Sequence, residues 1–381
     1  MKKGLLLISP YFSPAVGGVE THLKDLCEYF EKRKTKVYVR TYKALGVKNR
    51  GKTNENGKYV KIHRMWWPDF GLVFRLENYA ILRILYIGLG LFTDTFIFLF
   101  KHSKEIETIH VHGFIAALWS LPLAKIFRKK IVIQTHVGFK FDKGSLMSQI
   151  IKQVLIRSDK ILVLTKNAKA QLLKIGLSEK NIEIYHYWVD KDTFRKINNA
   201  REVLKWGKGF YVLFVGRLVE VKGVKTIVKL AKKLQDLTFV VAGSGPLSPY
   251  LEEESKKLKN LLFLGKVENS KLPIYYSAAD TLLIPSQIVD QTYEEGIPRV
   301  MIEALYCGLP VIATPSGGIP DVFDEEIGKM IKDDIGEMVK AIKSTSFNKS
   351  ELKEVLRYCR SYALLKFGIK NAQIIEKTLT K

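Results

Sequence analysis

The sequence is poor in cysteine, with only Cys27, Cys307 and Cys359 among 381 residues. Three scattered cysteines exclude a disulfide framework or a CxxC metal site. No GxGxxG follows the first apolar run, which disfavours a dinucleotide-dependent dehydrogenase, and no DxD-like metal site stands at the end of an expected strand. We therefore expect a protein of a reducing compartment that uses no cofactor and no metal ion.

Long hydrophobic runs are also scarce. The start, MKKGLLLISPYF, lacks a full signal-peptide core and a small-residue cleavage site, so it is expected to be a first buried strand of a cytoplasmic protein. Residues 79–100 are long enough to cross a bilayer, but they include Arg83 and Asp94. Because charges at those depths are costly in lipid, a buried or interfacial amphipathic helix is the favoured interpretation.

Positive charge is abundant and unevenly distributed. The formal net charge is +24; residues 1–190 hold 32 Lys and Arg against 15 Asp and Glu, whereas the remainder holds 30 against 23. A basic first half attracts an anionic membrane surface, nucleic acid or a phosphate-bearing substrate, and charge alone does not separate these. A lysine-rich proteome is the simpler alternative. No recognised nucleic-acid-binding module is present, so we expect no nucleic-acid partner.

Short apolar runs alternate with helical patterns along the whole chain. The expected strands of the first half include residues 5–9, 37–40, 109–111, 131–135, 161–165 and 182–185, and those of the second half include 211–216, 239–243, 261–265, 281–286 and 311–314. This alternation predicts α/β architecture with parallel sheets covered by helices. A polar stretch at about 188–205 is expected to be the linker, and residues 48–58 to be a loop.

A glycine pair, Gly17 and Gly18, stands between the first expected strand and a helix, in PYFSPAVGGVE. Such glycines let the backbone approach a ligand closely and aim amide groups of a helix N-terminus at an anion. As a bare pair they are also typical of a tight turn.

Arg217 and Lys222 follow a strand of the second half, in FVGRLVEVKGV. Open α/β sheets bind ligands at the carboxyl ends of their strands, where a guanidinium and an ammonium group could neutralise a diphosphate without metal. Taken alone, two cations five residues apart are commonly solvated surface charges.

Two glutamates frame a predicted helix at residues 298–307. Pro298 suits the first helical position, and Gly308 gives a stop signal. Glu303 lies inside this helix among apolar neighbours, where we expect its carboxylate to accept hydrogen bonds from a polyol. The alternatives are a helix-capping acid for Glu295 and a buried ion pair for Glu303.

Glu295 and Glu303, within EGIPRVMIEALYCGLPVIAT, resemble the E-x7-E motif of retaining GT-B glycosyltransferases of family four, also called glycosyl transferases group one. VGRLVEVKGV, PAVGGVETH, VVAGSGPL, ADTLLIPS and SGGIPDV are similar to other segments of that family, in the family's order. The resemblance implies two Rossmann-like domains facing each other across a cleft. It assigns residues 1–188 to an acceptor-binding domain, 189–360 to a nucleotide-sugar-binding domain, and 361–381 to a helix that returns to the first domain.

The resemblance also implies roles for single residues. Arg217 and Lys222 would bind the donor diphosphate, Glu303 the ribose hydroxyls and Glu295 the donor sugar. Backbone amides after Glu295 would hold the sugar as well, except at Pro298, which has no N–H group. The implied donor-binding set is Gly17, Gly18, Gly216, Arg217, Lys222, Gly243, Gly245, Gly265, Lys266, Val267, Glu295, Gly296, Ile297, Pro298, Arg299, Val300 and Glu303.

IHVHGF and IVIQTHVGF resemble the family's two strand-end histidine segments. They place His112 and His136 at strand ends on the acceptor side, and His136 matches the family's active-site histidine. The implied catalytic residues are thus His136, Arg217, Lys222 and Glu295. For His110 and His112, a satisfied core histidine is the alternative.

The implied activity is that of a metal-independent, retaining hexosyltransferase. It would move a hexosyl or N-acetylhexosaminyl group from a nucleotide-diphosphate sugar, such as a UDP- or GDP-sugar, to a glycan or lipid-linked acceptor, with peripheral binding to an anionic membrane surface. Two alternatives stay open: a GT-B sugar-nucleotide epimerase, and a basic nucleic-acid-binding protein.

Overall fold

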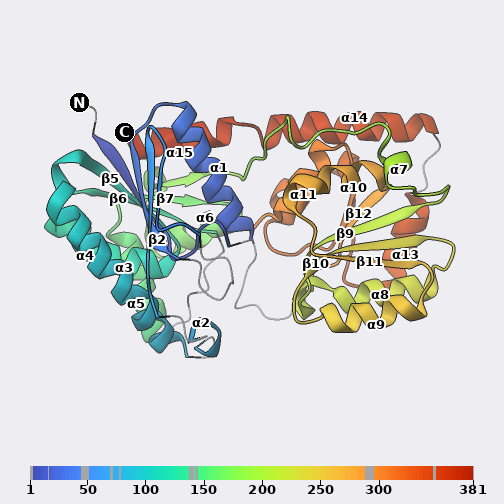
Figure 1. Ribbon diagram of the computed structural model, residues 1–381, viewed down its shortest axis with the longest axis horizontal. Coiled ribbons are helices and arrows are strands. Elements are labelled where there is room, and N and C mark those ends of the chain that lie inside the picture. Colours follow the sequence, from blue (N-terminus) through green and yellow to red (C-terminus); the bar gives the residue numbers. More distant parts are fainter. Residues whose placement is uncertain are drawn as a thin grey trace. The chain divides into compact units, whose positions relative to one another are not determined.

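The structure is a computed structural model, and it describes residues 3–15, 17–43, 51–68, 72–76, 79–136, 141, 145–287, 296–345 and 349–380. The chain forms two compact units (Figure 1). The first unit comprises Met1–Tyr185 together with Lys370–Lys381, and the second comprises His186–Ile369. Each unit contains a largely parallel sheet with helices on its faces, which confirms the predicted α/β class.

The sheet of the first unit has the strand order β3-β4-β2-β1-β5-β6-β7-β8. These strands are β1 (Gly4–Ile8), β2 (Val37–Tyr42), β3 (Asn54–Asn56), β4 (Val60–Met65), β5 (Ile106–His112), β6 (Lys130–Gln134), β7 (Lys160–Val163) and β8 (Ile182–Ile184). All neighbours are parallel except β3, which is antiparallel to β4. The loop expected at 48–58 therefore contains a short edge strand, fixed in part by a 2.7 Å hydrogen bond between Asn54 Oδ1 and His63 Nδ1.

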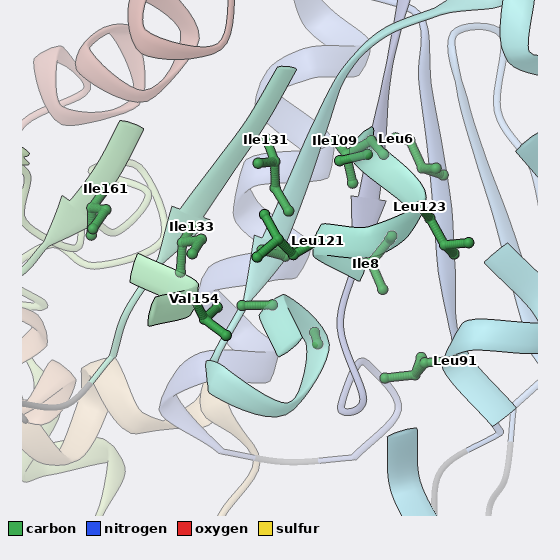
Figure 2. Packing of buried hydrophobic residues seen from close by; sticks show 14 of the residues in the cluster. Leu6, Ile8, Leu91, Ile109, Leu121, Leu123, Ile131, Ile133, Val154 and Ile161 are labelled. Atoms are coloured by element: carbon green, nitrogen blue, oxygen red, sulfur yellow. The ribbon is translucent and has the colours of Figure 1, made fainter. Parts of the chain in front are cut away.

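One face of this sheet packs on three helices. The helices of the first unit are α1 (Gly18–Lys32), α2 (Leu72–Arg75), α3 (Ala80–His102), α4 (Phe114–Ile126), α5 (Leu146–Ile156), α6 (Lys166–Lys174) and α15 (Lys370–Thr380). Figure 2 shows Leu121 of α4 beside Ile131 and Ile133 of β6, with Val154 of α5 near Ile133. Leu91 of α3 and Ile109 of β5 belong to the same buried cluster. Because side chains along a strand alternate between the two faces of the sheet, the residues next to each of these isoleucines on its own strand point to the opposite face.

Helix α15 is hydrogen-bonded to β5 and to α1. Thr108 Oγ1 of β5 donates to the carbonyl of Leu379 at 2.9 Å, and Tyr29 Oη of α1 donates to Glu376 at 2.6 Å. Helix α15 thus belongs to the first unit.

The sheet of the second unit is entirely parallel, in the order β11-β10-β9-β12-β13-β14. Its strands are β9 (Tyr211–Arg217), β10 (Thr238–Ser244), β11 (Leu261–Gly265), β12 (Thr281–Ile284), β13 (Val311–Ala313) and β14 (Gly328–Met330). Its α-helices are α7 (Ala200–Val203), α8 (Val224–Lys233), α9 (Ser248–Lys257), α10 (Leu272–Ala278), α11 (Arg299–Tyr306), α12 (Ile319–Val322), α13 (Ile335–Ser344) and α14 (Lys349–Lys366). The described residues of the first unit also form two short 3-10 helices, η1 (Ser103–Glu105) and η2 (Glu179–Asn181). Those of the second unit form η3 (Glu220–Lys222), η4 (Asn269–Lys271) and η5 (Glu325–Ile327).

The segment expected to be a linker, residues 188–205, is folded onto α10 instead. Lys196 Nζ donates to the carbonyl of Ser277 at 2.9 Å, and the Ile197 amide donates to Ser277 Oγ at 2.9 Å. Folded polar residues of this kind look like a linker in the sequence because their partners are distant backbone groups.

The unit boundaries differ from the expected positions at 188 and 360. The first crossing lies between Tyr185 and His186, and the second unit extends to Ile369. Helix α14 continues beyond 360, and the carbonyl of Phe367 accepts a 3.1 Å hydrogen bond from Tyr306 Oη of α11. This bond ties the end of the segment to the second unit.

Candidate functional site

In the second unit, the strand order reverses between β9 and β12. Doubly wound sheets bind ligands at such a switch point, outside the carboxyl ends of the strands. Gly216 and Arg217 end β9 at this point. The Arg217 side chain is exposed and forms no hydrogen bond or ion pair with a described residue. A guanidinium group is therefore available to an anion at the switch point.

The turn between β9 and α8 carries Lys222 on η3, half-buried and directly before the start of the helix. Gly223 has φ +72°, and a Cβ there would lie 2.0 Å from the carbonyl oxygen of Pro285. Gly223 is thus required for both backbone shape and close approach. The amide of Gln287 also donates to the carbonyl of Val221 at 2.8 Å. These contacts hold the cation-bearing turn against the loop that follows β12.

The predicted glycines of β9 and β10 meet in register, Gly216 opposite Gly243. A Cβ at Gly243 would lie 1.9 Å from the carbonyl oxygen of Gly216, and one at Gly245 would lie 2.6 Å from that of Leu218. Close packing of the two strand ends therefore accounts for Gly243 and Gly245 by itself. Gly265 ends the next strand, β11, with φ +65°. Three neighbouring strands thus end in glycine or just beyond it.

Glu303 on α11 is 2% exposed and sits in a hydrogen-bonded network. Its Oε1 accepts from Arg299 Nε and from Asn269 Nδ2, each at 3.2 Å, and its Oε2 accepts from Tyr276 Oη at 2.9 Å. Burial raises the pKa of the Glu303 carboxyl, and the Arg299 charge opposes that effect. The carboxylate thus forms the buried ion pair that stood as the alternative to polyol binding. Asn269 also joins α11 to the segment after β11, which begins with Lys266 and Val267.

Of the other residues in this motif, Glu295 lies outside the described residues. Gly296, Ile297 and Pro298 are buried, and Val300 is half-buried. Pro298 is the N-cap of α11, with φ −63° and ψ 121°, rather than its first helical residue. Helix α11 therefore begins one residue later than the sequence predicted.

In the first unit, Gly17 is the N-cap of α1 and its carbonyl accepts from the Thr21 amide at 3.0 Å. A Cβ at Gly18 would meet no heavy atom within 4 Å. The described part of the protein therefore gives no packing reason for a glycine at position 18. Open space at a helix N-terminus is compatible with the predicted approach of an anion.

Four histidines form a cluster beside the carboxyl ends of β5 and β6. We define the histidine cluster as His22 of α1, His110 and His112 of β5, and His136 after β6. His112 Nδ1 lies 3.1 Å from His136 Nε2, and the rings of His110 and His112 are 4.2 Å apart. Gln134 Nε2 donates to His22 Nε2 at 2.7 Å. The two predicted histidines are thus in direct contact.

Three members of the histidine cluster, His110, His112 and His136, are held in their neutral form. Burial lowers the pKa of His110 to about 3, and burial together with the neighbouring His110 lowers that of His136 to about 3. His110 and His112 are 1% and 2% exposed, so they are core residues. The alternative of a satisfied core histidine is met for burial only, because neither ring nitrogen of His110 nor Nε2 of His112 has a hydrogen-bond partner among the described residues. Tyr185 Oη lies 3.5 Å from His136 Nδ1. A neutral His136 can accept a proton or a hydrogen bond at one ring nitrogen while the other donates.

Among the described residues, no three His, Cys, Asp or Glu side chains are grouped so that they could hold a metal ion. The histidine cluster is therefore a network of imidazoles that contact one another and the Gln134 amide.

Comparison with known proteins addresses both units. Residues 16–193 match the family described as Glycosyltransferase Family 4, and residues 196–363 match Glycosyl transferases group 1. Sucrose-phosphate synthase from Thermosynechococcus elongatus has the same fold, with a TM-score of 0.79 and 20% identity over 98% of each chain. The chain belongs to the GT-B glycosyltransferases of group 1 and family 4.

Individual relatives of this glycosyltransferase agree with the assignment. An uncharacterized glycosyltransferase of Methanocaldococcus jannaschii is 25% identical, covering 89% of this chain and 88% of its own. A phosphatidylinositol N-acetylglucosaminyltransferase from Arabidopsis thaliana is 26% identical over 90% of this chain and 74% of its own. Anabaena HepE, solved in complex with UDP-glucose, has a TM-score of 0.74 and 16% identity over 98% of each chain.

Sequence reasoning missed several residues that the glycosyltransferase places in these networks. His22 and Gln134 contact one another across two elements, and only the sheet order reveals that α1 reaches β6. Tyr276 and Asn269 were missed because they lie far from Glu303 in the sequence. The Arg299 to Glu303 pair did have a signal, since residues four apart face each other on a helix.

Proposed function

We propose that this glycosyltransferase is a metal-independent, retaining hexosyltransferase. It takes a hexosyl or N-acetylhexosaminyl group from a nucleotide-diphosphate sugar and transfers it to a lipid-linked or cell-envelope glycan. The observation that carries the proposal is the exposed Arg217, which pairs with no described residue, at the switch point of the second sheet and five residues before Lys222. UDP-glucose in the related HepE structure supports a donor of this class.

The proposed chemistry depends on charge that develops during the reaction. As the glycosidic bond stretches, negative charge grows on the departing diphosphate. Arg217, Lys222 and the first amides of α8 then stabilise the transition state more than the bound donor. The resemblance assigns no protein nucleophile, so the acceptor attacks from the face that the diphosphate leaves, and the anomeric configuration is retained.

The neutral histidine cluster supports an acceptor role for the first unit. A His136 imidazole whose pKa is lowered by burial stays uncharged, and an acceptor hydroxyl that displaces Tyr185 Oη from its long 3.5 Å contact could donate a hydrogen bond to Nδ1. His112 fixes the orientation of that ring through its 3.1 Å contact. We assign His136 the task of orienting the acceptor, with His112 as a positioning residue.

A donor screen tests the proposal. A ligand that binds only the native state raises the unfolding temperature by mass action, so UDP-, GDP- and ADP-sugars are compared by thermal unfolding. We expect stabilisation by one nucleotide class in the natural protein and loss of that stabilisation in the Arg217→Ala/Lys222→Ala variant. Equal stabilisation of both proteins would remove the two cations from the donor site.

Product analysis tests the reaction itself. With the stabilising donor and a lipid-linked glycan, NMR of the product is expected to show the anomeric configuration of the donor. An inverted product contradicts retention. Incubation with the donor alone is the control, because an epimer formed without an acceptor would identify an epimerase instead.

Helix α3 supports the membrane part of the proposal. Its outward side chains form what we term the α3 apolar strip: Ile81, Leu82, Leu85, Leu89, Phe96, Ile97 and Phe100, which are between 40% and 74% exposed. The helix is long and apolar enough to cross a bilayer, and 33% of its most apolar window is buried. Exposed Lys101, Lys104, Lys125 and Arg128 on α3, η1 and the end of α4 complement an anionic lipid surface.

The inner face of α3 is tied to the sheet. Arg40 Nε of β2 donates to Asp94 Oδ2 at 2.6 Å, and Trp119 Nε1 of α4 donates to the carbonyl of Ile84 at 3.2 Å. Extraction of α3 into a bilayer would break this ion pair and expose the core face of the sheet. We therefore propose that α3 lies along the surface of an anionic bilayer with its apolar strip in the interface.

Vesicle flotation separates this role from non-specific adsorption through exposed apolar residues. The natural protein is expected to float with phosphatidylglycerol vesicles at low salt. The Ile81→Ser/Leu85→Ser/Leu89→Ser variant is expected to bind them at least tenfold more weakly, since three apolar side chains that would be buried in the interface are lost. The control Val203→Ser/Leu262→Ser/Met330→Ser changes exposed apolar residues of the second unit. Absence of flotation, or equal loss in the control, contradicts the proposal.

A further inference from the structure

A cavity of about 1020 Å³ opens at the amino ends of β1, β2, β4 and β5 in the first unit. Its wall includes Lys3 before β1, Lys36 before β2, Lys58 before β4 and Glu107 at the start of β5, and α15 completes it. The start of β1 and the end of α15 lie near each other in Figure 1, and Thr108 of β5 bonds to Leu379. The cavity thus lies at the amino ends of the strands, whereas the histidine cluster lies at their carboxyl ends.

Positive charge dominates the wall of this cavity. Its seven basic residues are Lys3, Arg33, Lys34, Lys36, Lys58, Lys61 and Lys377, and its two acidic residues are Glu107 and Glu376. Arg33 pairs with Glu376 at 3.4 Å, and Lys36 pairs with the neighbouring Glu105 at 2.6 Å. The other five lysines form no ion pair with any described residue. We refer to these five as the unpaired lysines.

Ordinary structural roles account for only part of this charge. Cations at the C-terminal end of a helix stabilise the helix dipole, which explains Arg33 and Lys34 after α1 and Lys377 in the last turn of α15. Lys3, Lys58 and Lys61 instead lie at the beginnings of strands, which have no comparable dipole. Like charges gathered around a concave surface repel one another and focus a positive potential into the cavity.

We propose that this cavity binds a small anion that carries several phosphate groups. The volume of about 1020 Å³ is at the upper end of the usual range for small-molecule sites. Lysine ammonium groups bind phosphate as point charges. Half-buried Tyr59 adds an aromatic surface to a wall that also contains Leu5 and Leu379. The site is independent of the proposed transferase reaction, because it shares no residue with the donor or acceptor positions.

Isothermal titration calorimetry with sodium tripolyphosphate tests this site. The full chain carries Arg217→Ala/Lys222→Ala, so that the proposed donor site contributes nothing to the measurement. In that background, Lys58→Gln/Lys61→Gln/Lys377→Gln is expected to bind tripolyphosphate at least tenfold more weakly at low ionic strength, because three of five unpaired charges are removed. Unchanged affinity of the cavity variant overturns the proposal, and so does failure of the parent to bind both tripolyphosphate and the phosphoinositide vesicles described below.

A matched control has the same charge change elsewhere. Lys229, Lys233 and Lys256 are exposed on α8 and α9 and form no ion pair with a described residue. The Lys229→Gln/Lys233→Gln/Lys256→Gln variant is expected to keep full affinity, and an equal loss there would show non-specific attraction and overturn the site. Lys34→Asn is a second cavity variant in case the triple variant does not fold, since asparagine tolerates the φ of 57° at this position.

The phosphate groups could be free or carried by a lipid. Flotation with phosphatidylcholine vesicles that contain phosphatidylinositol 4,5-bisphosphate separates the two sources. Binding that the cavity variant loses identifies a lipid headgroup, whereas tripolyphosphate binding without flotation through these lysines identifies a soluble anion. Either result supports the site, and the absence of both overturns it.

Discussion

The two sheets present opposite chemistry at their carboxyl ends. In the first unit, the strand ends carry neutral histidines, with His110 and His112 almost fully buried. In the second unit, the strand ends carry an exposed Arg217, with Lys222 in the following turn. Sheets with the same architecture therefore supply an uncharged hydrogen-bonding surface in one case and a cationic surface in the other.

The difference shows that the surroundings of a strand end determine its chemistry. Burial beneath α1 removes the charge of the histidines, because their protonated form would lose its solvation. Arg217 at the end of β9 is exposed and Lys222 in the following turn is half-buried, and glycines allow the adjoining backbone segments to lie close together. The proposed division of labour, acceptor on the first unit and donor on the second, follows from this contrast.

The strongest test of the second unit concerns its one buried charge pair among the described residues. Glu303→Ala leaves the Arg299 guanidinium without its carboxylate and Tyr276 without its acceptor. The free energy of unfolding is expected to fall by about 3–5 kcal/mol, measured by urea denaturation. Glu303→Gln keeps an acceptor oxygen and is expected to lose less. Equal losses in the two variants would show that the network requires the charge of Glu303 and that an acceptor oxygen alone contributes little.

The same glutamate separates structure from ligand binding. If Glu303 also holds the ribose, nucleotide affinity in the folded Glu303→Gln variant falls by about 1.5–3 kcal/mol, the range for hydrogen bonds to a charged group. Calorimetric titration with the nucleotide of the stabilising donor measures this. Unchanged affinity restricts Glu303 to the Arg299, Tyr276 and Asn269 network.

Lys222→Ala tests whether the cations that follow β9 take part in the reaction. Turnover is expected to fall roughly a hundredfold to a thousandfold, the usual cost of one transition-state donor. Lys225→Ala, three residues later on α8, is the control, since Lys225 is exposed and pairs with Glu220 at 2.6 Å. Steady-state rates at saturating donor decide the matter, and a full rate in Lys222→Ala excludes it from the mechanism.

The buried, neutral histidines of the first unit predict that the folded protein loses stability in acid. The pKa of His110 is about 3 in the folded chain, so the unfolded chain binds more protons between that value and the ordinary pKa near 6.5. Stability is therefore lost as pH falls below about 6.5, with a slope of at most about 1.4 kcal/mol per pH unit for each such histidine. His112 contributes in the same direction.

Urea unfolding between pH 7.5 and 4.5 measures this slope. A His110→Gln variant is expected to have a shallower dependence below about pH 6.5 and the same dependence as the natural protein above it. An unchanged slope would show that burial does not hold His110 neutral. Glu105, whose pKa is lowered to about 2 mainly by its bonds with Lys36 and Tyr38, adds a loss of stability only at lower pH.

Much of the fold could be predicted from the sequence, because apolar runs of strand length and helical periodicity agree with the elements found. The runs at 211–216 and 239–243 became β9 and β10 with small changes of boundary. Strand β3 was missed, since a polar three-residue edge strand is defined only by its pairing with β4.

The candidate site was predictable where a motif marked a strand end, as at Arg217 and His136. Partners that topology alone brings together were not predictable. His22 lies more than a hundred positions before Gln134, yet the two side chains are 2.7 Å apart. The ion pair between Arg299 and Glu303 could have been anticipated from its helical spacing, but their apolar surroundings favoured a ligand-binding interpretation.

The placement of α15 has a consequence for biosynthesis. The ribosome must synthesise all of the second unit before it makes Lys370–Lys381, which belongs to the first unit. The nascent first unit therefore waits with Thr108 of β5 lacking its bond to Leu379, and with Tyr29 of α1 lacking Glu376. A stop codon just before Lys370 would leave a finished second unit attached to an unfinished first one.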